Sequence, residues 1–517
     1  MATTKEHSEG SEMEIVPMKE KLAYAFATMP GTFYGSVMGL IQSFYFAFMG
    51  LQNIWIVIGQ VVYAVWNLIN DPLFGNAINN TKFYNKRRGE YQRYIPYIKY
   101  GAPLFSLAFA LVFFPPATLR GSQDLSIQVW LFVWYLVSQI AYDSLFTLVL
   151  CAHVALLPQM TLDQREREKI QILCTLFTLP GVFIGFFLPL AFLSDPTVES
   201  IRIFQILVVG IAIFGLIPYL VVSYVVREHS EHIPEEPTPL LKGLKLAFKN
   251  KSYIIYLIYD GVSVFIINVS MATLPFFLTW VLGPMTSSTL EMILFWIPPV
   301  ICLIVGAIII LRIADKKSTK TALSFYQGVL ALGYLLTFAL AFTQLWYLVC
   351  AGFSIVFLAF SGDFILHNPM RADTIDYDFW KISGERREGL YAGIGPLISK
   401  PMISVALATP TSIMTLFGLI YVEARQILGF TLMEGSLQPT MGTFNAFLAV
   451  NIAMGLIPGL VALLGFIIWV LAYPLTGEVV DEMKSALVKI HEERRIKYLK
   501  ELGETKPDES NNNNNNK

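Results

Sequence analysis

Long apolar runs alternate with short polar segments along most of the chain. A helix needs about 20 residues to cross the hydrocarbon core of a bilayer, and twelve runs reach that length. They cover residues 22–50, 53–76, 97–117, 127–157, 168–194, 202–226, 253–282, 288–312, 320–343, 345–372, 389–418 and 443–473. Periodicity within the runs is weak, as expected of helices that are apolar nearly all round. The pattern predicts an all-α membrane protein with twelve transmembrane helices.

Polar stretches at both ends and in the middle divide these helices into two bundles of six. The middle stretch, 227–252, is rich in Glu, Pro and Lys, and residues 1–20 are polar and acidic, so no cleavable signal peptide is expected. The Asn-rich run 511–516 is typical of disorder. The expected segments are a cytoplasmic start at 1–21, a bundle at 22–226, a cytoplasmic loop at 227–252, a bundle at 253–475 and a cytoplasmic tail at 476–517.

Lys and Arg gather in the loops after the second, fourth, eighth and tenth predicted helices. Cytoplasmic loops carry an excess of these residues, so both termini are expected in the cytoplasm. Two six-helix bundles with cytoplasmic termini predict the major facilitator fold, in which the binding site lies between the bundles near the middle of the membrane. A twelve-helix protein of another class is the alternative.

The composition supports a membrane protein. Hydrophobic residues make up 55% of the 517, charged residues only 15%, and the mean hydropathy is +0.56; a soluble protein carries about 25% charged residues. The 37 Lys and Arg balance 38 Asp and Glu, so a nucleic-acid partner is not indicated. The four cysteines lie in apolar runs without CxxC spacing, which excludes a disulfide scaffold. Metal-ligand spacings, phosphate loops and nucleophile elbows are also missing, so neither an enzyme nor a cofactor is expected.

Several ionisable side chains fall inside the predicted helices, where each costs about 2.5–3.5 kcal/mol on insertion scales. Lys400 lies about 17 Å from the cytoplasmic end of its helix, and Asn67 and Thr147 fall at a similar depth. Asp71 is one turn from Asn67 on the same face. These depths predict an ammonium group level with an oxygen-rich cluster on the other bundle. The remaining ionisable residues inside helices are Asp143, His153, Asp260, Asp363 and His367.

Other interpretations of these residues stay open. Lys400 can extend its side chain to an interface, and Asp71-Pro72 can end a helix near the cytoplasm. Asp143 and Asp260 suit helix packing or external gating at least as well as substrate contact. For the two histidines, packing or hydrogen bonding is the more common role than proton transfer.

Three motifs follow one another at the ends of predicted helices. They are VWNLINDPLFG at 65–75 with KRRGEYQRYIPY at 86–97, LLPQMTLDQREREK at 156–169, and RADTIDYDFWKISGERREGLYAGIGPLISK at 371–400. In these motifs the chain resembles the glycoside–pentoside–hexuronide:cation symporter family of the major facilitator superfamily. Lipid symporters that carry lysophospholipids belong to the same wider group, so the resemblance does not determine the substrate.

The resemblance implies a cation site on the second and fourth helices. The family pattern has two carboxylates one turn apart on the second helix, an Asn between them and a hydroxyl on the fourth helix. Asp71, Asn70 and Thr147 match the second carboxylate, the Asn and the hydroxyl, whereas Asn67 replaces the first carboxylate. Asp71 is then the only acid expected in the site, where oxygen ligands suit Na⁺. Either Na⁺ or H⁺ is left as the coupling ion, and no other metal is expected.

Lys400 matches the family lysine thought to connect the cation and sugar sites. The melibiose-type sugar site is not retained, because Thr32, Leu150, Thr175 and Val154 replace its two acids, its arginine and its tryptophan. A galactoside bound in that manner is therefore not expected. The further candidates for substrate contact or coupling are Thr32, His153, Phe364 and His367.

Charges at the predicted cytoplasmic ends suggest a gate. Arg167 and Glu168 are expected to approach Asp373, Asp376 and Arg386 when the cytoplasmic side closes. Taken together, the sequence predicts a monomeric, multi-pass protein of the cell membrane, a cation-coupled symporter of sugar- or glycoside-like solutes. A lysolipid or amphiphile symporter of the same fold, or a membrane receptor or scaffold without transport, are the alternatives.

Overall fold

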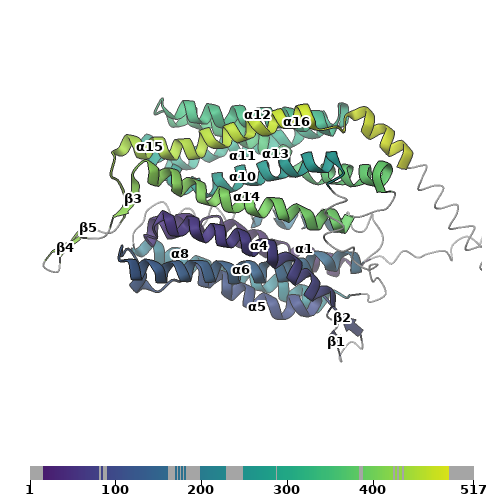
Figure 1. Cartoon of the computed structure of the whole chain (residues 1–517), viewed down its shortest axis with the longest axis horizontal. Helices are drawn as coiled ribbons and strands as arrows, with labels where there is room; N and C mark the ends of the chain where they lie inside the picture. The colour runs from purple at the N-terminus through teal and green to yellow at the C-terminus, as the bar shows by residue number, and fades with distance from the viewer. Residues whose placement is uncertain are drawn as a thin grey trace, which may run out of the picture.

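The computed structural model describes residues 16–80, 83–85, 90–160, 169–171, 173–174, 176–178, 180–181, 198–228, 248–286, 288–383, 388–422, 425–427, 430–433 and 436–487. Long helices run side by side in two groups, with those of the first half of the chain below those of the second half in Figure 1. The described part of the chain therefore has the two-bundle arrangement that the apolar runs predict.

The first half begins with a broken helical stretch and continues with long helices. Its helices are α1 (Met18–Phe26), α2 (Met29–Met38), α3 (Ile41–Ser43), the π-helix η1 (Phe44–Phe48), α4 (Asn53–Asn80), α5 (Ile95–Val112), the 3₁₀ turn η2 (Ala117–Leu119), α6 (Leu125–Met160) and α8 (Val198–Val225).

The second half consists mainly of six long helical stretches. They are α10 (Lys251–Phe277) with η3 (Leu278–Leu282) and η4 (Gly283–Met285), α11 (Thr289–Lys316), α12 (Thr319–Ala341), α13 (Trp346–Tyr377) with η5 (Asp378–Ser383), α14 (Glu388–Leu416), and α15 (Thr443–Asn451) with η6 (Ile452–Leu456) and α16 (Ile457–Ala472). A further helix covers 477–487.

Three short antiparallel strand pairs, which the apolar pattern did not predict, project from the two ends of the bundle. β1 (Phe83–Asn85) pairs with β2 (Glu90–Gln92). Between α14 and α15, β3 (Leu419–Val422) pairs with β6 (Ser436–Pro439), and β4 (Arg425–Ile427) pairs with β5 (Phe430–Met433). Figure 1 shows the β3–β6 segment at the opposite end from 477–487, and we call that end of the bundle the hairpin end.

Within the described residues, ten helices are long and apolar enough to cross a membrane. The two remaining predicted spans are the first, 22–50, which is a series of short helical segments, and the fifth, 168–194, which lies partly outside the described residues. Helix α4 runs on through Asp71 and Pro72 to Asn80, so this Asp-Pro pair does not end the helix. Helix α13 extends to Tyr377, five residues beyond the predicted end of that span.

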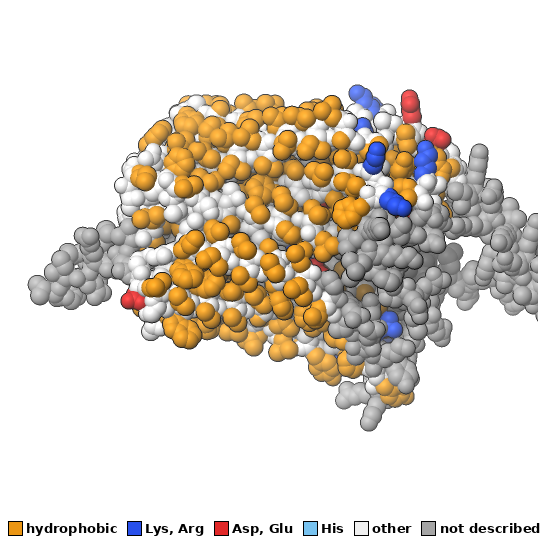
Figure 2. Space-filling view, in the orientation of Figure 1, with side chains coloured by type: hydrophobic (Ala, Val, Ile, Leu, Met, Phe, Trp, Pro, Cys, Tyr) orange, Lys and Arg blue, Asp and Glu red, His pale blue; other side chains and the backbone are white. Residues whose placement is uncertain are grey.

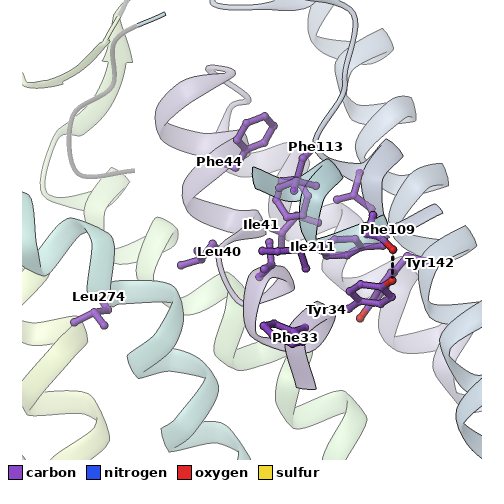
Figure 3. Packing of buried hydrophobic residues seen from close by; sticks show 14 of the residues in the cluster. Phe33, Tyr34, Leu40, Ile41, Phe44, Phe109, Phe113, Tyr142, Ile211 and Leu274 are labelled. Atoms are coloured by element: carbon purple, nitrogen blue, oxygen red, sulfur yellow. Dashed lines mark hydrogen bonds between the residues drawn. The ribbon is translucent and has the colours of Figure 1, made fainter. Parts of the chain in front are cut away.

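Aromatic side chains of the first helical stretch form the centre of the larger apolar core. Phe33, Tyr34 and Phe44 are at most 3% exposed, and Figure 3 shows them packed near Phe109 and Phe113 of the third membrane helix. Tyr34 stacks on Phe109 with ring centroids 4.3 Å apart. The aromatic residues of this stretch therefore pack inside the protein and do not face lipid.

The two halves are joined at the hairpin end. The core around the first helical stretch continues into α10, η3 and α13 of the second half, whereas the other large core belongs to the second half alone. Ser43 donates a hydrogen bond to the Ala272 carbonyl at 3.2 Å, and Asn53 donates to Ser412 at 3.4 Å. The ring of Tyr421, on β3, packs directly against the first half at Gly50, which has a positive φ of 73°.

The face shown in Figure 2 is covered by apolar side chains over most of its length, and basic side chains gather at the end opposite the hairpin. We call this the charged end; Lys316, Lys320 and Lys484 lie there, where α11 ends, α12 begins and 477–487 packs. An apolar belt bordered by charges fits a bilayer. The charged end is the one that the distribution of Lys and Arg predicts to be cytoplasmic.

Candidate functional site

Lys400, in the middle of α14, reaches across to the first half of the chain. Its Nζ donates a hydrogen bond to Asp71 Oδ1 at 2.6 Å. The same nitrogen lies 3.3 Å from Asn67 Oδ1 and 3.4 Å from Thr147 Oγ1. The side chains of Lys400 and Asp71 are only 17% and 23% exposed, so the ammonium does not extend to an interface. The structure thus brings together Lys400, Asn67, Asp71 and Thr147, the four residues whose positions along their helices predicted similar depths in the membrane.

Helices α4 and α6 hold the oxygen atoms of this cluster. Asn67 and Asp71 are one turn apart on α4, so their side chains stack on the face toward α14. Thr147, on α6, donates its hydroxyl to Asp71 Oδ1 at 3.1 Å and accepts from Asn70 Nδ2 at 3.3 Å. All the residues expected for the cation site therefore lie in one connected network.

Asp143 is a second acid in this network, which corrects the expectation that Asp71 is the only one. Its Oδ1 lies 4.0 Å from Lys400 Nζ and accepts from the Tyr63 hydroxyl at 2.9 Å. Its Oδ2 accepts from Asn70 Nδ2 at 2.7 Å. The side chain is buried and its hydrogen bonds connect α6 to α4, so it also contributes to helix packing. Asp143 lies one turn from Thr147 on α6, and this spacing was the sequence signal that could have found it.

The donor set of the cluster suits a hard monovalent cation. It combines two carboxylates, amide oxygens and a hydroxyl, and the Asn70 Oδ1 is a buried oxygen without a hydrogen-bond partner. Two carboxylates and one ammonium leave a formal charge of −1, enough to balance one Na⁺. Among the described residues, no group of three His, Cys, Asp or Glu is placed so that it could hold a metal ion.

Two residues predicted to contact substrate are placed elsewhere. Thr32 donates its hydroxyl to the Met29 carbonyl at 2.8 Å within its own helix. His153 is 1% exposed, stacks on Tyr24 with centroids 4.3 Å apart, and has its Nε2 3.1 Å from the Tyr24 carbonyl. Among the described residues, neither side chain is hydrogen-bonded to Lys400, and a role of either in substrate contact stays a prediction.

The other two such residues belong to the second half. The side chain of Phe364 lies outside the described part of the structure. His367, on α13, contacts Asp260 of α10, with Nε2 3.1 Å from Oδ1. Asp260, an intramembrane aspartate of this half, is therefore paired with a histidine.

The predicted gate is only partly visible. Arg167, Glu168 and Arg386 lie outside the described residues, so their approach to the other half remains a prediction. Asp373 and Asp376 are half-buried at the charged end of α13. Asp373 is within electrostatic reach of Lys484, on the helix at 477–487.

The profile of one protein family, described as MFS/sugar transport protein, matches residues 21–477. Transmembrane protein 180 of Gallus gallus is 26% identical over 165 residues, which are 31% of this chain and 30% of that protein. Sodium-dependent lysophosphatidylcholine symporter 1 of Mus musculus is 27% identical over 169 residues, 32% of this chain and 29% of that protein. The chain thus spans less than a third of the length of these curated relatives.

Solved structures match over a greater length. A D-xylose-proton symporter has a TM-score of 0.58 and 14% identity, with 88% of this chain and 97% of that chain covered. At this identity the likeness concerns the fold, which is that of the major facilitator transporters.

Proposed function

The chain belongs to the MFS/sugar transport protein family, and from that premise we propose that it is a sodium-coupled symporter of sugar- or glycoside-like solutes. Members of this family are membrane transporters of small solutes and not enzymes. The chain is an integral, multi-pass membrane protein. The choice of ion and of solute is the part that we propose.

One observation carries the proposal: Lys400 lies between Asp71 and Asp143, with Nζ–Oδ1 distances of 2.6 Å and 4.0 Å. A lone Asp71 would be neutralised by the ammonium, leaving no charge for a metal cation. The carboxylate of Asp143 supplies the negative charge that is missing because Asn67 replaces the first carboxylate of the family pattern. Sodium is therefore favoured over a proton as the ion bound at this cluster.

The geometry also suggests how the ion and the solute are coupled. A Na⁺ ion that enters beside Asp71 and Asp143 competes with Lys400 for their oxygens. The displaced ammonium then has three donors available for a solute hydroxyl or other acceptor. Each ligand thus changes the affinity of the other, and the coupling must be reciprocal. Because Lys400 belongs to one half and the carboxylates to the other, this exchange acts where the halves meet in alternating access.

A sugar-like solute is supported by the family description and by the polar side chains around Lys400. Tyr63, Asn67 and Thr147 offer hydroxyl and amide groups that pair with solute hydroxyls.

An amphiphile is the second candidate, because a groove of about 690 Å³ opens between α11 and α13. Its lining, which includes Leu294, Ile297 and Trp346, is mostly apolar and suits an acyl chain. The weak similarity to a lysophosphatidylcholine symporter points the same way.

Thermal unfolding of the purified protein, with and without Na⁺, tests the proposal against panels of sugars, glycosides and lysolipids. A ligand that binds the folded state raises the midpoint. We expect Na⁺ and a sugar-like solute each to raise it, and each to strengthen the effect of the other. The matched control is Lys400→Ala, in which the solute effect and its dependence on Na⁺ should be lost together. Stabilisation by lysolipids alone would favour the amphiphile, and equal effects of Na⁺ and choline would contradict sodium coupling.

A further inference from the structure

A second polar cluster lies inside the second half, between α10 and α13. Asp363 of α13 accepts hydrogen bonds from the hydroxyls of Tyr259 and Ser263 on α10. One turn along α13, His367 Nε2 lies 3.1 Å from Asp260 Oδ1 and 2.9 Å from the Tyr256 hydroxyl. We call these six residues the α10–α13 cluster: Tyr256, Tyr259, Asp260, Ser263, Asp363 and His367.

Helix α14 separates this cluster from the cation site. A Cβ on Gly261, next to Asp260, would lie 3.5 Å from Ile398 and 3.4 Å from Met402, so α10 packs on that face of α14. Lys400 is two residues from each of them, and two residues rotate a helix by about 200°. Lys400 therefore points to the opposite side of α14, toward Asp71. The two clusters are distinct sites.

A proton would halve the negative charge of the α10–α13 cluster. Asp260 is 8% exposed, and the described side chains that contact Asp363 are hydroxyl donors. In the described part of the chain, His367 is the basic side chain that contacts Asp260. The buried carboxylate of Asp260 and the half-buried one of Asp363 are costly without a cation. A proton on the imidazole forms an ion pair with Asp260 and leaves one charge, on Asp363, shared by two donors.

Other titratable groups surround the cluster at a greater distance. Arg371 is exposed, one turn from His367 on α13, and acts electrostatically on Tyr253 and Tyr256. The charged residues of α11 lie near its two ends. Further titratable groups on the same or neighbouring elements include Lys251, Lys320, Tyr326, Tyr334, Asp373, Tyr391 and Tyr473.

The α10–α13 cluster is partly accessible from outside the protein. The side chains of His367 and Asp260 are 27% and 11% exposed, whereas His153 of the first half is 1% exposed. A proton on His367 can therefore exchange with solvent. A fully buried histidine such as His153 does not allow this exchange.

We propose that the α10–α13 cluster is a proton-binding site, in which one exchangeable proton is held by His367 against Asp260. The site is separate from the cation cluster at Lys400, and its occupancy makes transport depend on pH even when Na⁺ is saturating. Proton uptake changes the cluster from two formal negative charges to one. Both α10 and α13 belong to the second half. The proton therefore enters or leaves through water that reaches this half from either side of the membrane.

The test is a pH jump on proteoliposomes of the full chain adsorbed to a solid-supported membrane, at saturating Na⁺ and without solute. A step from about pH 8 to about pH 6 crosses the range in which imidazole titrates. Wild-type protein should give a transient movement of charge. His367→Gln should reduce that charge about tenfold or more, because an amide does not take up a proton in this range. His153→Gln, the matched control, should keep it within about twofold of wild type.

Asp260→Asn provides a second variant should His367→Gln not yield a monodisperse protein, and it should lower the charge several-fold. Unchanged charge in either folded variant would overturn the proposal, as would equal loss in the His153→Gln control. Steps in Na⁺ concentration at constant pH measure charge movement at the other site, the cation cluster at Lys400. They should depend on Asp71 and not on His367, so failure of the sodium proposal is distinguishable from failure of this one.

Discussion

Replacing Asp143 by Asn is the sharpest perturbation of the cation cluster. The change removes a charge while nearly preserving the shape. Tyr63 can still donate to the remaining side-chain oxygen, as it does to Oδ1 at 2.9 Å. Asn70 can rotate its amide so that its unpartnered Oδ1 accepts from the new NH₂ group. The variant therefore loses electrostatic attraction and keeps both hydrogen bonds of the side chain at 143, while the rotation of Asn70 gives up its 3.3 Å bond to Thr147.

The magnitude follows from the distance of 4.0 Å between Asp143 Oδ1 and Lys400 Nζ. At that separation a unit charge is attracted by about 4 kcal/mol with an effective dielectric constant of about 20. A Na⁺ ion in place of the ammonium would experience a similar attraction. The lower cost of removing a neutral amide from water offsets part of it. A net loss of about 2 kcal/mol corresponds to about thirtyfold weaker Na⁺ binding.

The assay is a titration of thermal unfolding with NaCl, with choline chloride maintaining the ionic strength. The midpoint of the Na⁺ effect should move to about thirtyfold higher concentration in Asp143→Asn. Asp260→Asn is the matched control, because it removes a buried carboxylate from the other half and should leave the Na⁺ midpoint unchanged. A normal Na⁺ midpoint in a folded Asp143→Asn variant would refute the assignment of Asp143 to the cation site.

Three further changes follow from the structure. Lys400→Ala should lose solute affinity and Na⁺ dependence together in the unfolding assay, and Lys400→Arg should restore them only in part, because the guanidinium is larger and planar. Tyr421→Ala removes a ring that packs between the halves at the hairpin end. Disulfide formation between cysteines placed at Asn53 and Ser412, which are hydrogen-bonded across the halves, should therefore fall several-fold. An unchanged disulfide yield would show that Tyr421 does not hold the halves together at this end. Burial raises the pKa of Glu228, so the stability contributed by its protonated form at low pH is lost as the pH rises through that raised pKa. Glu228→Gln should therefore remove one step from the pH dependence of the unfolding temperature, and persistence of that step would contradict the assignment.

The sequence by itself determined the membrane class, the two-bundle plan and most of the cation cluster. The length of each apolar run sets where a helix can cross the bilayer, and ten of the runs appear as long helices in the described residues. Depth along a helix follows from the residue number, which is why the order of residues alone places Lys400, Asp71, Asn67 and Thr147 at one level. The motifs at the helix ends then indicated a cation-coupled transporter.

Only the tertiary structure decided which side chains face one another. Helices that are apolar nearly all round carry no stripe that marks their inward face, so Asp260 could not be assigned to a partner from its own helix, and only its spacing from Thr147 pointed to Asp143. Packing of α4 against α6 turns Asp143 toward Lys400, and packing of α10 against α13 brings Asp260 to His367. The segmented first helix and the hairpin after α14 were missed for the same reason. Contacts between the halves, such as that of Tyr421 with Gly50, involve both segments and cannot be read from either one alone.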